Sequence, residues 1–344
     1  MKNERYLYLD VVKGIAIISV VLGHIILKYE SNNFLCIWLY SFHLPIFFIV
    51  SGILFALNPK KLSIGNKEFI LKKAKNLLYP YLTFSIISII YLVIKGERLV
   101  SIIKVCINTI CLFGYGPIWF LPTLLISEIL TFFLLKKARK TKLLCIIIMT
   151  IFIIIMSNLL QISYWQENII NEIIYKILNL IVRSLIATLF ILGGYYFQKK
   201  KYKIIKNPNL YVFILLINIF ICQINGLIDI HYCKINNFAL FTYTAYTTSI
   251  SIIIIIEKIC KSENILSFFG KNSLIIMATH YTLPFIEVAK FLCNNVLRIK
   301  NLYALYFFET IIVMLLEYVI IIIINKKLNF LIKIKKLGEK NEEI

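Results

Sequence analysis

Residues 8–28 read YLDVVKGIAIISVVLGHIILK, an apolar stretch long enough to cross the hydrocarbon core of a bilayer as one helix. Nine more stretches of similar character follow, at approximately 37–57, 77–94, 117–135, 143–160, 178–197, 209–225, 238–257, 273–293 and 302–325. None shows the strict alternation of apolar and polar residues that membrane strands have. The sequence therefore predicts an all-α polytopic membrane protein with about ten transmembrane helices.

Composition excludes several other classes of protein. Of the 344 residues 60% are hydrophobic and only 16% are charged, whereas soluble domains carry about 25% charged residues. The net charge of +21 comes from short basic clusters between the apolar stretches, which is typical of membrane topology. We therefore expect membrane lipids as partners and no nucleic acid. The eight cysteines form no CxxC pair, and we expect neither a metal site nor a disulfide framework.

The loop charges predict an orientation. If the N-terminus is cytoplasmic, the inner loops hold 27 Lys and Arg residues and the outer loops hold nine. This asymmetry follows the positive-inside rule and places both termini in the cytoplasm, in a multi-pass protein of the plasma membrane. We expect one membrane-embedded domain at 1–325 and a basic, then acidic, cytoplasmic tail at 326–344. The extra apolar stretch at 99–113 is expected at the interface or re-entering the membrane.

The first predicted helix carries three polar residues that are costly in lipid: Asp10, Lys13 and His24. Lys13 and His24 are eleven residues apart, which places them on one helix face with an axial separation of about 16 Å. Asp10 lies one turn before Lys13 and can pair with it. One helix thus presents a cation near its cytoplasmic end and an imidazole deeper in the membrane.

His43 enters the second predicted helix at a depth matching that of His24, and the short hairpin makes the two helices neighbours. Two histidines facing one cavity suit general acid–base catalysis, although each also suits a packing role. Intramembrane histidines and carboxylates also suit proton-coupled transport. His280 lies in the ninth predicted helix, and Glu287 is expected on the same face seven residues later.

Other polar and aromatic residues admit a structural interpretation as well as a functional one. Glu128, Arg183, Glu309 and Glu317 are expected to form structural ion pairs within the membrane. His231 falls in an outer loop, where we expect it to be solvated. Trp119 and Phe120 begin the fourth span, where Trp119 suits an interfacial aromatic belt. The basic cluster of Lys72, Lys73 and Lys75, followed by Tyr81, suits either lipid headgroups or a phosphorylated molecule.

Five segments together resemble the membrane-bound acyltransferase 3 family, and the resemblance runs in order along the whole chain. They are Tyr8 to His24 with its Asp10-x-x-Lys13-Gly14 motif, Phe42-His43-x-Pro45-x-Phe47-Phe48-x-x-Ser51-Gly52, Lys72 to Tyr81, Gly116 to Leu121, and Gly270 to His280. Lys13 stands where the family usually has arginine, and it keeps the charge without the guanidinium fork. The branch that resembles this chain most is that of fucose 4-O-acetylase-like proteins.

The resemblance implies an O-acyltransferase that moves acetyl from cytoplasmic acetyl-CoA to a hydroxyl of a cell-surface glycan or its lipid-linked sugar precursor. His24, His43 and Asp10 are then the catalytic candidates, with His24 as general base or transiently acylated residue. Lys13, Lys72, Lys73, Lys75 and Tyr81 are candidates for binding acetyl-CoA. The candidates for contacting the acceptor are Trp119, Phe120, His280 and Glu128. A secondary transporter or glycan flippase is the alternative function.

Overall fold

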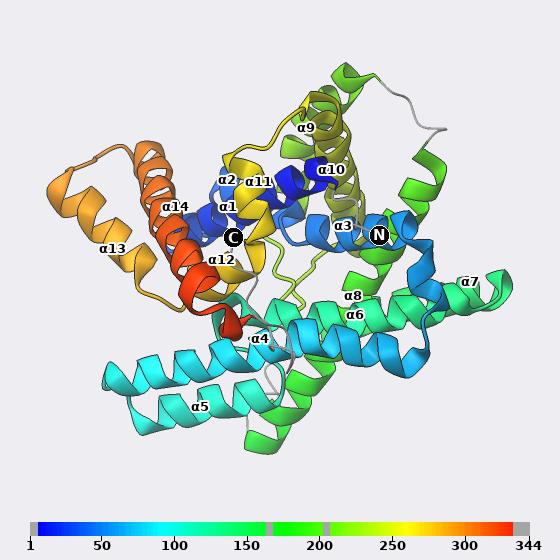
Figure 1. The fold of residues 1–344 in the computed structure, drawn as a ribbon, viewed down its shortest axis with the longest axis horizontal. Coiled ribbons are helices and arrows are strands. Elements are labelled where there is room, and N and C mark those ends of the chain that lie inside the picture. The colour runs from blue at the N-terminus through cyan, green and yellow to red at the C-terminus, as the bar shows by residue number, and fades with distance from the viewer. Residues whose placement is uncertain (1–5, 163–167, 202–206, 333–344) are drawn as a thin grey trace.

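The computed structural model describes residues 6–162, 168–201 and 207–332, and these residues fold into a bundle of α-helices (Figure 1). Within them nine helical segments are long and apolar enough to cross a membrane. They are α1 (Leu7–Leu27), Phe34–Leu57 (α2, Phe34–Phe42, and α3, Pro45–Leu57), α4 (Asn66–Ile94), Gly116–Lys136 (with α6, Phe120–Lys136), α7 (Arg139–Leu159), α8 (Ile169–Lys200), α9 (Pro208–Asn225), α10 (Phe238–Ile259) and α14 (Leu302–Lys327). The predicted polytopic all-α class is confirmed.

The predicted continuous helix at 273–293 is not formed. The chain instead makes two short helices there, α12 (Ser273–Thr279) and α13 (Phe285–Phe291), and a third, α11 (Ile265–Lys271), comes directly before them. The break between α12 and α13 falls just before Pro284, which lacks a backbone N–H and disfavours helical geometry at the residue before it. The expectation that Glu287 shares a helix face with His280 was therefore wrong.

The stretch at 99–113 forms α5 (Leu99–Ile110), a helix of 12 residues that packs beside α4 (Figure 1). Twelve residues rise only about 18 Å, which is shorter than the hydrocarbon core. The chain then turns through Gly114 and Gly116, both with positive φ, and enters α6. Most residues of this turn line a cavity between the helices, which is described below.

Two helix crossings are so close that they admit only glycine. At the crossing of α3 and α8, a Cβ on Gly52 would lie 1.9 Å from the Ile191 carbonyl oxygen, and one on Gly194 would lie 2.1 Å from the Ile49 carbonyl oxygen. Small residues let membrane helices approach closely, where van der Waals packing replaces the hydrophobic effect. The same device joins α1 to α11, because a Cβ on Gly14 would lie 2.0 Å from the Leu266 carbonyl oxygen.

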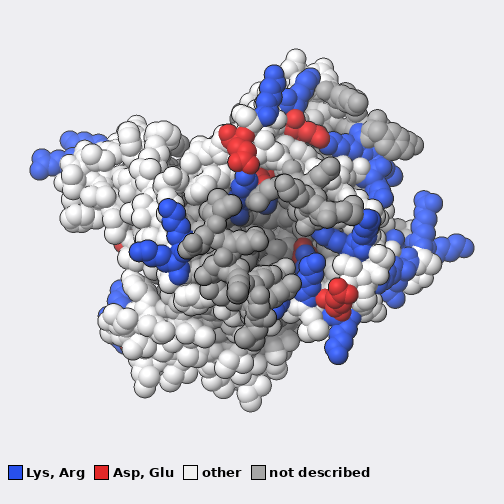
Figure 2. All heavy atoms as spheres, viewed as in Figure 1, with Lys and Arg blue, Asp and Glu red and all other residues white. Residues whose placement is uncertain are grey.

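Charged residues occupy the smaller part of the face that Figure 2 shows. In Figure 2 most of the visible face is uncharged, and Lys and Arg are more conspicuous than Asp and Glu. Large apolar side chains are exposed along α4, α7, α9 and α14, as expected for helices that face lipid. Of the predicted tail at 326–344, α14 includes the first two residues and a 3₁₀ turn covers Asn329–Leu331, while residues 333–344 lie outside the described residues.

Candidate functional site

A cavity of about 490 Å³ lies where α1, the α2–α3 segment, the turn before α6, the α9–α10 loop and the end of α12 meet. We call it the histidine cavity. Three histidines from three separate segments line it, His24, His43 and His231, together with Asp229 and the ammonium-bearing Lys28. His24 and His43 thus line the same cavity, and the prediction that their two helices are neighbours is confirmed.

His24 lies among aromatic rings at the centre of this group. Its Nδ1 is 3.2 Å from the Tyr40 hydroxyl, and its ring centroid is 5.4 Å from that of His280 and 5.7 Å from that of Tyr281. The Tyr40 ring in turn meets His43 edge-on at 4.7 Å between centroids. His24 is therefore held in one orientation while part of its ring remains accessible from the cavity.

Backbone carbonyls fix the tautomers of the two histidines beside His24. His43 Nδ1 lies 2.6 Å from the Leu39 carbonyl oxygen, and His280 Nδ1 lies 2.5 Å from the Ile276 carbonyl oxygen. A carbonyl oxygen only accepts, so each Nδ1 donates its proton and each Nε2 keeps a lone pair. His280 Nε2 is buried and has no hydrogen-bond partner among the described residues. Both imidazoles therefore offer a proton acceptor next to His24.

An aromatic wall closes one side of the histidine cavity. The rings of Trp119 and His231 stack at 5.0 Å with an interplanar angle of 5°, and Phe113 lies 4.5 Å from His231. Behind the wall, the buried Arg183 lies over Trp119 at 5.0 Å and donates from Nη2 to the Leu112 carbonyl oxygen at 2.6 Å. Arg183 thereby holds the 112–119 turn in place through one hydrogen bond and a cation–π contact.

The sequence did not identify His231 as a site residue, and the expectation that it is solvated was wrong. It is half-buried, lines the cavity, and its Nε2 lies 3.2 Å from the Phe113 carbonyl oxygen. Burial and the nearby Arg183 charge hold the pKa of His231 well below 6.5, so it is neutral at neutral pH. Burial also raises the pKa of Asp229, although that carboxylate accepts hydrogen bonds from the backbone N–H groups of His231 and Tyr232. The 112–119 turn and the α9–α10 loop are far apart in the chain. Only their contact in the folded structure shows that His231 belongs to the cavity.

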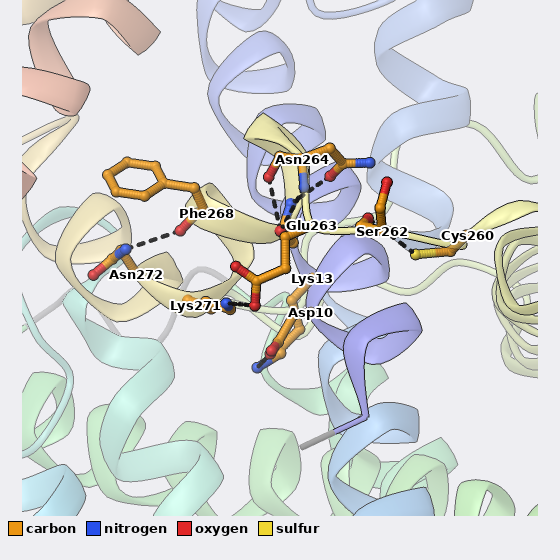
Figure 3. A network of polar contacts seen from close by, with 10 residues as sticks. Asp10, Lys13, Cys260, Ser262, Glu263, Asn264, Phe268, Lys271 and Asn272 are labelled. Carbon is orange, nitrogen blue, oxygen red and sulfur yellow. Dashed lines mark hydrogen bonds and ion pairs between the residues drawn. The ribbon is translucent and has the colours of Figure 1, made fainter. Parts of the chain in front are cut away.

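A second, smaller cavity of about 190 Å³ lies further toward the N-terminal end of α1. We call it the lysine cavity, and Lys13, Ser51, Glu128 and Ser273 are among the residues that line it. The predicted pairing of Lys13 with Asp10 is confirmed, with 2.7 Å between the charged atoms. Figure 3 shows these two residues beside α11, close to a second ion pair between Lys271 and Glu263.

The candidates for contacting acetyl-CoA separate into different positions. Lys73 pairs with buried Glu128 at 2.6 Å, and Glu128 also accepts a hydrogen bond from Ser51 at 2.5 Å. Lys72 and Lys75 are exposed on the same turns of α4. Tyr81 is fully buried, and its hydroxyl donates to the Thr109 carbonyl oxygen at 2.8 Å, which joins α4 to the end of α5.

The four candidates for contacting the acceptor also divide between the cavities. Trp119 lines the histidine cavity, and His280 lies directly behind His24. Phe120 and Glu128 instead line the lysine cavity. The structure thus places Glu128 with the lysines and not with the histidines.

The predicted structural ion pairs form in one case of four within the described residues. Glu128 pairs with Lys73, whereas Glu309 accepts from the Tyr29 hydroxyl at 2.5 Å and Glu317 from the Thr279 hydroxyl at 2.8 and 2.9 Å. Arg183 uses a carbonyl and aromatic faces in place of a carboxylate. Lipid-buried charges need some partner, but sequence alone does not show which neighbour supplies it.

No group of three or more His, Cys, Asp or Glu side chains in the described residues has the spacing to hold a metal ion. A family model described as an acyltransferase domain, that of the acyltransferase 3 family, matches residues 6–325. No curated protein and no solved structure matches the chain. The match includes every residue that lines the two cavities.

Proposed function

The chain belongs to the acyltransferase 3 family, and on that premise we propose that this multi-pass membrane acyltransferase moves an acetyl group from acetyl-CoA to a hydroxyl of a cell-surface glycan or lipid-linked sugar. The observation that carries the proposal is the arrangement of two cavities along one bundle. One is mainly apolar and also holds the side chains of Lys13, Ser51, Ser273 and Glu128, and the other is lined by histidines and aromatic rings. A fucose 4-O-acetylase-like specificity is part of the same proposal.

The lysines suit the donor because coenzyme A carries several phosphate charges. Exposed Lys72 and Lys75 would bind these phosphates at the surface, since the lysine cavity of about 190 Å³ fits only the narrow pantetheine arm. Lys13, which remains partly accessible beside Asp10, would lie along the arm. The excess of Lys and Arg in the loops on this side supports a cytoplasmic location for it, in a plasma-membrane protein with both termini inside.

The histidine cavity suits the transfer step. His24 takes the proton from the acceptor hydroxyl, whose oxygen attacks the thioester carbonyl carbon. The new C–O bond forms, the C–S bond breaks, and the proton passes to the leaving thiolate to give free coenzyme A. An acylated His24 is the alternative route. Because His43 Nε2 is an acceptor, His43 suits orientation of the acceptor hydroxyl better than stabilisation of an oxyanion.

A sugar acceptor fits the walls of this cavity. Stacked Trp119 and His231 present flat faces of the kind that pack against the C–H face of a pyranose ring, while Asp229 and Asn108 line the cavity as hydrogen-bond partners for hydroxyls. Polar groups placed among aromatic surfaces fix the orientation of a ligand. Asp10 contributes indirectly in this scheme, because it holds the Lys13 ammonium group.

The experiment is transfer of radiolabelled acetyl from acetyl-CoA in membranes from expressing cells, where the membranes supply the acceptor, followed by mass spectrometry of surface glycans. His24→Ala should abolish labelling and the acetyl mass increment while the folded protein is retained. Tyr243→Phe, a half-exposed position on α10, is the control that should keep wild-type labelling. Normal acetylation with His24→Ala would refute the assignment, and unlabelled wild-type membranes would favour the transporter alternative.

A further inference from the structure

The two cavities follow one another along the same chain segments. On α1, Lys13 lines the lysine cavity, whereas Val20 and His24 line the histidine cavity. On the α2–α3 segment the change falls between Leu44, which lines the histidine cavity, and Phe47, which lines the lysine cavity. The cavities are therefore stacked end to end within the bundle.

The boundary between the cavities lies at one level of the bundle. Neighbouring residues Trp119 and Phe120 line different cavities. So do Leu274 on α12 and Tyr281, which follows the end of α12. Among the described residues that line these cavities, Met277 alone lines both. The wall that separates the two cavities thus includes the side chain of Met277.

Packed aromatic rings lie on the lysine-cavity side of this boundary. Phe47 and Phe120 meet edge-to-face with 5.7 Å between ring centroids, and Phe120 also stacks on Phe48 at 5.0 Å. Methionine is unbranched and has three rotatable bonds, so it changes shape at lower cost than packed aromatic rings. Met277 is 2% exposed and lies on α12, which ends two residues later at the break before Pro284. It is therefore the part of the wall that can move.

We propose that Met277 is the specificity-determining residue for the acyl group, because its side chain limits the width of the passage from the lysine cavity to His24. The inference rests on the proposed function. The thioester at the end of the pantetheine arm must pass Met277 before its carbonyl carbon reaches the acceptor hydroxyl beside His24. An acetyl group needs the smallest opening, and each added methylene needs a wider one.

The test compares acetyl-CoA, propionyl-CoA and butyryl-CoA as radiolabelled donors in membranes that contain the full-length protein and its own acceptor. Met277→Ala should raise the butyryl-to-acetyl ratio of incorporation by about tenfold or more, since one methylene in an apolar site is worth about 10- to 200-fold. Met277→Leu, which keeps the side-chain volume, should retain the wild-type ratio. Ile275→Ala, an equally buried truncation on α12 that lines neither cavity, should also retain it.

An unchanged ratio in Met277→Ala, together with loss of transfer in His24→Ala, would overturn this inference and leave the proposed function standing. If wild-type membranes transfer no acyl group, the proposed function fails and a second measurement decides about the wall. Met277→Cys should react with a small membrane-impermeant thiosulfonate from either side in sealed vesicles of opposite orientation. Both variants are made in a background whose eight native cysteines are replaced by alanine, and there Ala278→Cys, which lines neither cavity, should stay unmodified. If Met277→Cys fails to react with the reagent on one of the two sides, the position of this side chain between the cavities is refuted.

Discussion

The hydroxyl of Tyr40 offers a substitution that removes one atom from the site and little else. Its oxygen lies 3.2 Å from His24 Nδ1. Tyr40→Phe deletes that contact but keeps the ring, which packs edge-on against His24 at 6.1 Å and against His43 at 4.7 Å between centroids. Because Tyr40 is only 8% exposed, the substituted ring cannot leave its place. The variant thus isolates the hydrogen bond that orients His24.

The size of the effect follows from the strength of such a bond. A hydrogen bond between uncharged groups contributes about 0.5–1.5 kcal/mol net, which corresponds to about a 2- to 12-fold change in rate. The separation of 3.2 Å between the hydroxyl oxygen and the ring nitrogen is at the long end of the range for a hydrogen bond, so we expect the lower part of that range, about 2- to 5-fold. Loss of the general base in His24→Ala should cost about 10²- to 10⁴-fold.

The assay is the initial rate of acetyl transfer in membranes with matched amounts of each variant. Tyr243→Phe controls for removal of a hydroxyl from a tyrosine outside the two cavities. A Tyr40→Phe rate equal to that of the wild type would refute the orienting role of the bond. A loss as large as that of His24→Ala would refute the magnitude and indicate that the Tyr40 hydroxyl itself takes part in proton transfer.

Three further predictions concern stability, read as thermal unfolding of purified protein. Glu128→Gln leaves the Lys73 ammonium beside a neutral amide and should lower the free energy of unfolding by about 3 kcal/mol. Lys73→Met in that background should recover part of the loss, and an unchanged melting temperature in Glu128→Gln would contradict this. Gly14→Ala should lower the free energy of unfolding by about 1–3 kcal/mol, because its Cβ would lie 2.0 Å from a backbone oxygen of α11. Gly65→Ala, whose Cβ would meet no atom within 4 Å, should be neutral, and equal effects of the two would refute the close crossing. Burial keeps the pKa of His231 well below the unfolded value of 6.5. Below about pH 6.5 the unfolded chain therefore takes up a proton that the folded chain does not, and the free energy of unfolding decreases as the pH is lowered. His231→Gln should therefore lose less stability than the wild type between pH 7 and pH 5, by up to about 1.4 kcal/mol per pH unit, and identical acid sensitivity would contradict this.

The lengths of the apolar stretches and their flanking charges predicted most of the helices, since a span must satisfy its own backbone in lipid. The failure at 273–293 has a local cause that the sequence displays: Pro284 interrupts an otherwise apolar stretch, and the chain breaks between α12 and α13. Apolar composition shows that a stretch belongs in the membrane, but it does not show that the helix is continuous. That break positions His280 behind His24 and sends Glu287 to Lys28 instead.

The sequence by itself determined the class of the protein, the helix carrying Asp10, Lys13 and His24, and the pairing of the first two, because each depends on composition or on spacing within one helix. Only the tertiary structure decided that His231 stacks on Trp119, that Glu128 pairs with Lys73, and that Met277 lies between two cavities. These contacts join segments far apart in the chain. Helix periodicity fixes which face a residue occupies, but which neighbour meets that face depends on how the helices cross, and here glycine crossings such as Gly14 against α11 set that geometry.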